Sequence, residues 1–223
     1  MRAMILAAGR GERLRPLTDS VPKAMVRAGG KPLIAWHLER LAAAGCREAV
    51  VNVSHLADQI VEGIGDGGRY GLRIAYSRER EPLETAGGIA QARALLGHAP
   101  FLLVNADVYC EIDFARLLAL PLGERLAHLV LVPNPQHRAD GDFSLAQGLV
   151  GNRGGARYTY AGIAVMSPEL VSTVTAGDKA PLAPLLRSAA ERQRISGELH
   201  RGIWQDVGTR ERLAELEVHL TRS

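Results

Sequence analysis

The sequence predicts an α/β fold in which a mixed, mostly parallel central sheet carries helices on both faces, a Rossmann-like three-layer α/β/α arrangement. Two observations support this prediction. Short apolar runs of strand length alternate with helical patterns through the first half of the chain, which is typical of a parallel sheet with covering helices. The 223 residues, of which 47% are hydrophobic and 23% charged, suffice for one core of ordinary globular composition. We therefore expect a single domain over residues 1–223.

The first half of the chain alternates regularly between strand and helix. A run of residues at helical spacing, followed by Gly45 as a stop, marks one helix: Leu33, Ile34, His37, Leu38 and Leu41. We expect strands at 3–7, 49–53, 72–76 and 101–104, and further helices at 56–64 and 88–96. The strand at 101–104 ends at Asn105, Ala106 and Asp107, which places polar side chains at the carboxyl edge of the sheet.

The second half loses this strict alternation. We expect strands of a mixed sheet at 127–132, 143–146, 158–166 and 198–205, and helices at 113–120, 168–175, 182–192 and 210–220. There is no internal repeat and no hexapeptide periodicity, which excludes a C-terminal left-handed β-helix.

Composition and charge narrow the function classes. No apolar run approaches the roughly 18 residues of a membrane-spanning helix, and no secretory core follows Met1, so we expect a cytoplasmic protein without a membrane partner. Cys46 and Cys110 are isolated, which predicts neither a disulfide nor a zinc site. The net charge of +3 comes almost wholly from scattered arginines, a pattern that favours small anionic ligands over nucleic acid.

The stretch LAAGRGERLRPLTDSVPKAM, residues 6–25, breaks an apolar strand into glycines, arginines and a lysine. Such a flexible, cationic loop indicates an anionic ligand. It does not fit the dinucleotide pattern GxGxxG, because Leu14 stands where the third glycine belongs. It does not fit the P-loop either, because the Gly30–Lys31 pair is followed by Pro32.

The stretch instead resembles the signature LAAGxGxRLxPLTxxxPK of the sugar-1-phosphate nucleotidyltransferase family. The matching positions are Gly9, Gly11, Arg13, Leu14, Pro16, Leu17, Thr18, Pro22 and Lys23. The resemblance implies a nucleotidyltransferase fold and an enzyme that joins a sugar 1-phosphate to a nucleoside triphosphate. In that reaction, Arg13 would hold the β- and γ-phosphates and Lys23 the α-phosphate, while Asp107 completes the catalytic set. The expected nucleotide-binding residues are Ala7, Ala8, Gly9, Gly11, Glu12, Arg13, Lys23, Thr85, Ala86, Gly88 and Asn105.

The resemblance also implies a Mg²⁺ cofactor held by two carboxylates. Asp107 follows the strand at 101–104 within VNADV, and Asp206 lies in WQDVGT, which is similar to the later metal motif of the family. Magnesium takes one or two carboxylates and fills its other positions with phosphate oxygens and water. Asp107 could instead be a plain turn residue, and Asp206 could instead cap the helix that follows it.

The segment PLETAGGI, residues 82–89, is similar to the base-reading segment of the family, although Thr85 could also simply cap a helix. Sugar binding is expected at Asp140, Gly141, Asn152 and Tyr160. Many relatives carry Glu-Lys-Pro between these segments, where this chain has GNRGGAR, so Lys179 or Arg201 would have to supply the missing charge. We therefore expect a nucleotide-binding half at about 1–110 and a sugar-binding half at about 111–223.

Across nearly its whole length the chain is most similar to the short bacterial uridylyltransferases that convert N-acetylmuramate 1-phosphate and UTP in peptidoglycan recycling. Mannose-1-phosphate guanylyltransferases share closely similar signatures and are the alternative. A non-catalytic sensor of the same fold is a further alternative. The lactyl carboxylate of a muramic acid calls for a cation in the sugar site, and four arginines could supply it: Arg138, Arg153, Arg157 and Arg201. A monomer or a homodimer is expected.

Overall fold

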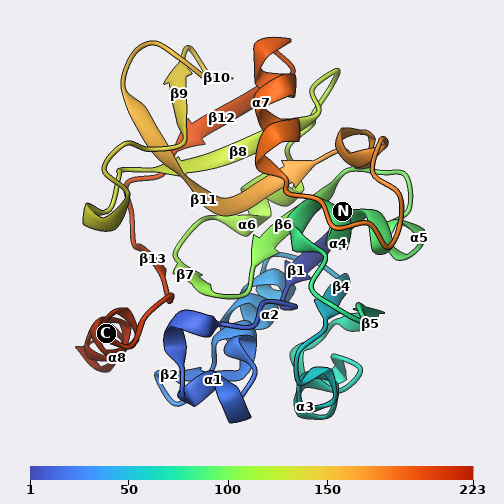
Figure 1. Cartoon of the computed structure of the whole chain (residues 1–223), viewed down its shortest axis with the longest axis vertical. Helices are drawn as coiled ribbons and strands as arrows, with labels where there is room; N and C mark the ends of the chain where they lie inside the picture. The colour runs from blue at the N-terminus through green and yellow to red at the C-terminus, as the bar shows by residue number, and fades with distance from the viewer. Residues whose placement is uncertain (223) are drawn as a thin grey trace.

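A nine-stranded mixed sheet forms the centre of the molecule in the computed structural model, which describes residues 1–222 (Figure 1). The strand order is β5-β4-β1-β6-β11-β8-β12-β10-β9. These strands are β1 (Arg2–Leu6), β4 (Glu48–Val53), β5 (Arg73–Arg78), β6 (Phe101–Asn105), β8 (Ala127–Val132), β9 (Phe143–Ala146), β10 (Leu149–Gly151), β11 (Arg157–Met166) and β12 (Ile195–Leu199).

The two halves of the sheet are paired differently. The four strands β5, β4, β1 and β6 are mutually parallel, as βαβ connections require. The long strand β11 then runs antiparallel between β6 and β8, and one further parallel pair joins β8 to β12. The predicted mixed α/β sheet is confirmed. Parallel pairing dominates only in the first half of the chain.

Helices cover both faces and complete three layers. Along β1, Ala3 and Ile5 face one layer and Met4 faces the other, because successive residues of a strand point to opposite sides. The helices are α1 (Leu17–Ser20), α2 (Leu33–Ala43), α3 (Ala57–Ile64), α4 (Glu84–Gln91), α5 (Arg93–Leu96), α6 (Phe114–Leu118), α7 (Ala183–Glu191) and α8 (Arg210–Arg222). The layer of α2, α3 and α6 packs on one face, and that of α4, α5 and α7 packs on the other.

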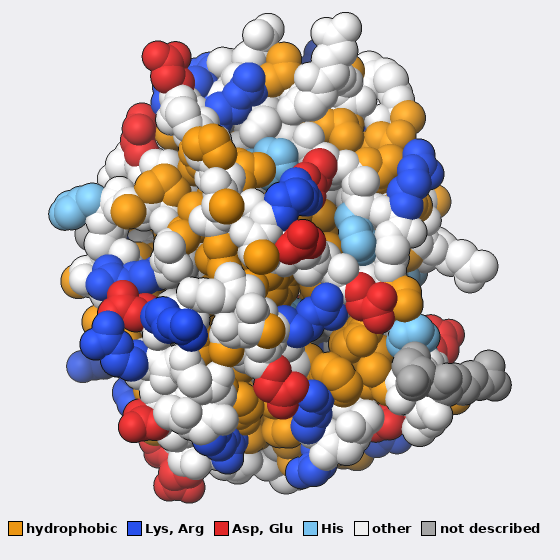
Figure 2. Space-filling model, turned by 180° about the vertical axis from the view of Figure 1, so that it is seen from behind, with side chains coloured by type: hydrophobic (Ala, Val, Ile, Leu, Met, Phe, Trp, Pro, Cys, Tyr) orange, Lys and Arg blue, Asp and Glu red, His pale blue; other side chains and the backbone are white. Residues whose placement is uncertain are grey.

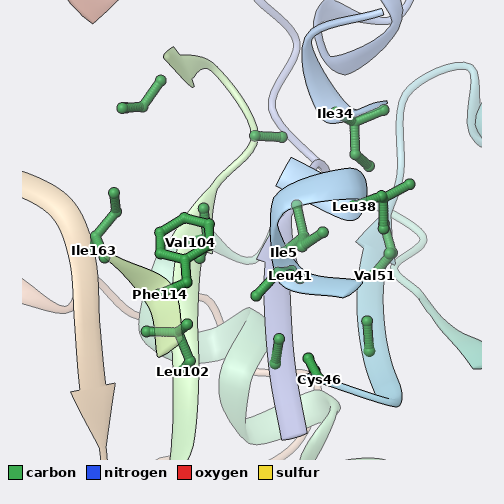
Figure 3. Close-up of a cluster of buried hydrophobic side chains, with 14 of the residues drawn as sticks. Ile5, Ile34, Leu38, Leu41, Cys46, Val51, Leu102, Val104, Phe114 and Ile163 are labelled. Atoms are coloured by element: carbon green, nitrogen blue, oxygen red, sulfur yellow. The ribbon is translucent and has the colours of Figure 1, made fainter. Parts of the chain in front are cut away.

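Figure 3 shows the first of these cores. Leu38 and Leu41 of α2 lie over Ile5 of β1 and Val51 of β4, while Phe114 of α6 packs near Val104 of β6. All five aliphatic side chains are fully buried. Burying a large apolar side chain contributes roughly 1.5–3 kcal/mol, so this layer holds the carboxyl ends of β1 and β6 in fixed positions.

A smaller cluster attaches the C-terminal helix. Leu216 of α8 packs with Val207, Tyr109 and Leu33 against the hairpin of β2 (Arg27–Ala28) and β3 (Lys31–Pro32). Next to it, β13 (Trp204–Asp206) pairs antiparallel with β7 (Val108–Cys110) outside the main sheet. This side pair places the residues just before α8 beside those just after β6.

Several predicted bounds are wrong. The expected strand at 198–205 is two strands in different sheets, β12 and β13, because the chain leaves the main sheet after Leu199. The expected helix at 168–175 is one short 3₁₀ turn, Pro168–Val171. The helix expected at 88–96 begins at Glu84 and breaks at Ala92. The short strands β2, β3, β7 and β10 were not predicted.

The surface mixes both charges. Basic and acidic side chains are interspersed over the face seen in Figure 2. Within the part of the chain that the structure describes, there is no helix with the length and apolar character needed to span a membrane.

Candidate active site

The loop after β1 is shaped by one glycine and one threonine. Gly11 has a φ of +66°, and a Cβ at this position would lie 2.9 Å from Cγ2 of Thr18 and 3.1 Å from Cβ of Lys23. The buried hydroxyl of Thr18 donates to the Gly11 carbonyl at 2.8 Å. Only glycine therefore fits where the loop approaches Lys23 this closely.

Lys23 and Asp107 meet at the end of this loop. The Lys23 ammonium group forms an ion pair with the Asp107 carboxylate. Lys23 belongs to a buried 3₁₀ turn, Lys23–Met25, and its side chain is only 11% exposed, whereas the Asp107 side chain is 35% exposed. Asp107 follows β6, and its carbonyl accepts a hydrogen bond from the Val207 amide at 2.7 Å. The Asp107 backbone is therefore held in place, while the side-chain carboxylate remains accessible to a ligand.

Two cavities share this ion pair. The first, which we call the inner cavity, has a volume of about 190 Å³. Its lining residues are Leu6, Ala7, Ala8, Gly9, Lys23, Ala24, Asn52, Glu79, Pro82, Glu84, Thr85, Asn105, Ala106 and Asp107. Of the residues predicted to bind nucleotide, Ala7, Ala8, Gly9, Lys23, Thr85 and Asn105 are therefore brought together in one wall.

The second cavity, the outer cleft, is wider, at about 690 Å³. Its lining residues are Gly9, Arg10, Gly11, Glu12, Arg13, Lys23, Glu81, Pro82, Asp107, Lys179 and Gly208. Among residues 1–222, neither the Arg10 nor the Arg13 guanidinium has a hydrogen bond or an ion pair, so both are free for an anion. Lys179 reaches this cleft from the second half of the chain, and its ammonium group lies 3.7 Å from a carboxylate oxygen of Glu84.

A buried polar pair that was not predicted closes the inner cavity. Asn52 Oδ1 accepts from the Ala7 amide at 2.8 Å, and Asn52 Nδ2 donates to Glu79 Oε1 at 2.7 Å. Glu79 Oε2 accepts from the Leu83 amide at 2.9 Å. Glu79 is 6% exposed, and this burial raises the pKa of its carboxyl group, although the two hydrogen bonds oppose the shift.

The small residues of the predicted base-reading segment also determine how the wall of the inner cavity is packed. Ala86 and Gly88 are buried behind the wall of the inner cavity, and a Cβ at Gly88 would lie 2.8 Å from both Asn52 Nδ2 and Glu79 Oε1. The amides of Ala86 and Gly87 both donate to the Ala180 carbonyl. The small side chains therefore make room for the Asn52–Glu79 pair and for the loop that carries Lys179, whereas Thr85 itself lines the cavity.

The two predicted metal ligands do not share a cavity. Asp206 lies opposite Val108 in the β13–β7 pair, and Val108 directly follows Asp107 in the chain. Its carboxylate forms an ion pair with Arg212 of α8, and its other oxygen lies 3.3 Å from His137 Nε2. Asp107 is open and fits as a single carboxylate ligand of Mg²⁺, which uses few protein ligands. Asp206 does not fit in this arrangement, because one of its oxygens is paired with the Arg212 guanidinium and the other lies against the His137 ring. Residues 1–222 contain no cluster of three metal-ligating side chains.

The predicted sugar residues form a network of their own. Arg157 donates to the carbonyls of Asp140, Gly141, Asp142 and Asn152. Asn152 also donates to the Arg187 carbonyl, and the Tyr160 amide donates to Asp142. The hydroxyl of Tyr160 is buried without a partner among residues 1–222. None of Asp140, Gly141, Asn152 and Tyr160 lines the inner cavity or the outer cleft.

The family model and the similar sequences identify the same family. The nucleotidyl transferase family model matches residues 2–141. An N-acetylmuramate alpha-1-phosphate uridylyltransferase of Neisseria meningitidis serogroup B is 51% identical over 97% of each chain. A mannose-1-phosphate guanyltransferase of Schizosaccharomyces pombe is 45% identical over 53% of this chain and 34% of its own length. A solved UDP-glucose pyrophosphorylase of Acinetobacter baumannii superposes with a TM-score of 0.80 at 16% identity, over 98% of this chain and 92% of the other.

Proposed function

Because the chain belongs to the nucleotidyl transferase family, we propose that it transfers a uridylyl group from UTP to N-acetylmuramate 1-phosphate and releases pyrophosphate. The observation that carries the proposal is the Lys23–Asp107 pair at the junction of the inner cavity and the cationic outer cleft. This geometry suits a ligand with a small uncharged end and a polyphosphate end. The 51% identity to an enzyme of that name supports the choice of base and sugar.

The reaction is a displacement at phosphorus. An oxygen of the sugar phosphate attacks the α-phosphorus of UTP, a new P–O bond forms, and the bond from the α-phosphorus to the bridging oxygen of pyrophosphate breaks. The protein therefore has to position two anions and stabilise negative charge, and it needs no covalent nucleophile.

The roles of the cations follow from their places in the cleft. Lys23 is buried between the two cavities, so its ammonium group stabilises charge that develops around the α-phosphate. Arg10 and Arg13 line the outer cleft and have no ion pair within residues 1–222, so they bind the β- and γ-phosphates that leave. Lys179 adds a further positive charge to the same cleft. It would take the place of the Glu-Lys-Pro lysine of many relatives, which this sequence lacks.

Asp107 is the residue that would hold Mg²⁺, together with phosphate oxygens of the substrates. The bound ion would neutralise part of the phosphate charge and withdraw electron density from the α-phosphorus. A role for Asp206 as a second ligand requires that its carboxylate leave Arg212 and His137, with which it is paired in this structure.

We propose that the uracil base binds in the inner cavity beside Glu79. The buried carboxylate can accept a hydrogen bond from the N3–H group of uracil. Guanine also presents an N–H group at the matching edge, so the mannose-1-phosphate guanylyltransferase alternative has to be separated by experiment.

The test is an assay of pyrophosphate release. The purified protein is assayed with ATP, CTP, GTP and UTP, each with N-acetylmuramate, N-acetylglucosamine or mannose 1-phosphate, in the presence of Mg²⁺ or of EDTA. We expect the fastest turnover with UTP and N-acetylmuramate 1-phosphate, and none with EDTA. Preference for GTP and mannose 1-phosphate would support the alternative, and binding of nucleotide without turnover of any pair would indicate a sensor.

A further inference from the structure

A third cavity lies beside the outer cleft and takes no part in the proposed nucleotide site. This lateral cavity, of about 800 Å³, is open to solvent and is lined by the loop after β8, the residues that lead into β13, and α8. Pro133, Pro135 and Trp204 form an apolar wall, and His137, Arg201 and Asp206 add polar groups. The cavity can therefore take a ligand that has both an apolar face and a charge.

Arg201 is the cationic side chain of this cavity that forms no ion pair within residues 1–222. It is exposed at the rim of the cavity, and its guanidinium makes no hydrogen bond either with any residue from 1 to 222. Arg212, by contrast, is engaged by Asp206 and by His137, and the remaining acid of the wall, Glu215, accepts a hydrogen bond from Gln205. A planar guanidinium without a partner in a cavity wall is suited to bind a carboxylate through two parallel hydrogen bonds.

The other arginines considered for this role are excluded by their surroundings. Arg138 forms an ion pair with Asp142 at 3.1 Å. Arg157 donates to four backbone carbonyls and so belongs to the framework of its loop. Arg153 lines neither the outer cleft nor the lateral cavity, so its guanidinium does not face either space.

The lateral cavity adjoins the outer cleft at Gly208. A Cβ at this position would lie 2.4 Å from Arg212 Nη2 and 3.1 Å from Arg13 Nη2, so the guanidinium groups of the two cavities approach the same glycine. Gly208 lines the outer cleft, and Asp206 and Thr209 line the lateral cavity. A sugar whose phosphate lies in the outer cleft can therefore extend its substituents past Gly208.

We propose that the lateral cavity is a subsite for a carboxylate-bearing substituent of the acceptor sugar, and that Arg201 is the residue that selects for it. This inference rests on the proposed function. The lactyl ether of N-acetylmuramate carries such a carboxylate together with a methyl group. The carboxylate binds Arg201, and the methyl group and sugar face pack on the wall of Pro133, Pro135 and Trp204.

The test compares two acceptors that differ only in the lactyl group. Arg201→Gln is assayed with saturating UTP and either N-acetylmuramate 1-phosphate or N-acetylglucosamine 1-phosphate. A hydrogen-bonded charge contributes about 1.5–3 kcal/mol, so kcat/KM for the muramate substrate should fall about 10- to 150-fold, mainly through KM. The value for N-acetylglucosamine 1-phosphate should stay unchanged. Arg201→Lys, which keeps the charge but not the fork, should recover part of the loss.

Arg153→Gln is the matched control, because it removes an exposed arginine, unpaired within residues 1–222, from the same half of the chain without touching the cavity. It should leave both values unchanged. Equal losses of Arg201→Gln with both acceptors, or no loss with either, would overturn the inference. A wild-type protein that does not prefer the muramate substrate would instead contradict the proposed function, so the two failures can be told apart.

Discussion

Lys23 and Asp107 form an ion pair where the inner cavity meets the outer cleft, and both residues line both spaces. Asp107 comes from the end of β6, in the middle of the sheet, whereas Lys23 comes from the loop that follows β1. β1 and β6 are parallel neighbours, so their carboxyl ends meet at one edge. A point charge of each sign is thus held at the place where phosphate and metal ion would meet.

Replacement of this lysine should affect the chemical step more than the fold. Lys23→Ala removes a preorganised charge beside the α-phosphate, so we expect kcat to fall on the order of 10²- to 10³-fold. The fold should survive, because the Asp107 side chain that loses its partner is 35% exposed and can be hydrated. Pyrophosphate release and a thermal melt of the purified variant measure the two effects. Turnover at the wild-type rate would show that the lysine has no such role.

Lys179 offers a weaker and salt-sensitive test of the outer cleft. Its side chain is 67% exposed, so its attraction for the triphosphate is screened by solvent and ions. We expect Lys179→Ala to raise the KM for UTP about three- to tenfold at low ionic strength, and less in high salt. Lys31→Ala is the matched control, because Lys31 pairs with Glu39 outside these cavities. The same rise in KM for both variants would point to a general charge effect.

The sequence predicts the parts of this site that depend on local pattern. The signature places Gly9, Gly11, Arg13 and Lys23 in one loop, and the glycine requirement at Gly11 appears in the structure as a positive φ against Thr18. The strands at 127–132 and 143–146 and the helix that follows WQDVGT were also predicted where they occur. The first is a continuous apolar run of strand length, and the other two have apolar residues at strand or helix spacing.

The sequence patterns did not predict the contacts between segments that are distant in the chain. Asn52 and Glu79 lie at or just after the ends of β4 and β5, the strands beside β1, and the rule that ligand sites collect at the carboxyl ends of parallel strands could have flagged both. The partners of Asp206 could not be foreseen in this way. Arg212 and His137 come from α8 and from the loop after β8, and only the folded packing brings them to one carboxylate.

We predict that the Glu79 carboxylate selects between pyrimidine bases. An ionised carboxylate can only accept hydrogen bonds, so it favours uracil, which carries a proton on N3, over cytosine, which does not. Glu79→Gln replaces one acceptor by a donor that faces either Leu83 N–H or Asn52 Nδ2, so we expect about a tenfold loss in kcat/KM for UTP. The preference for UTP over CTP should shrink as well.

The pH dependence of this preference provides a second readout. Burial raises the pKa of the Glu79 carboxyl group, so it gains its proton at a higher pH than an exposed glutamate does. Once protonated, it can donate to N3 of cytosine, and the UTP/CTP ratio of kcat/KM should decrease as the pH falls. The exposed Glu62 of α3 supplies the control variant, Glu62→Gln, which should keep the wild-type ratio at every pH.

His37 makes the fold sensitive to mild acid. It is 1% exposed in α2, with neither ring nitrogen hydrogen-bonded within residues 1–222, and burial lowers its pKa from 6.5 to about 4. The unfolded chain therefore binds this proton in a pH range where the folded chain does not, and stability decreases as the pH falls from about 6.5 toward about 4. Between pH 7.5 and pH 5, this group alone costs about 2 kcal/mol of unfolding free energy.

His37→Leu isolates this contribution. The leucine has a similar volume and suits the apolar surroundings near Phe114, so the variant should fold, and it should lose about 2 kcal/mol less than the wild type between pH 7.5 and pH 5. Urea unfolding at the two pH values measures this difference. Other titrating groups, such as Glu198, whose pKa lies at about 2 because Arg116 and His128 outweigh its burial, are common to both proteins and cancel. Identical losses in the two proteins would show that the buried imidazole is not the acid-sensitive group.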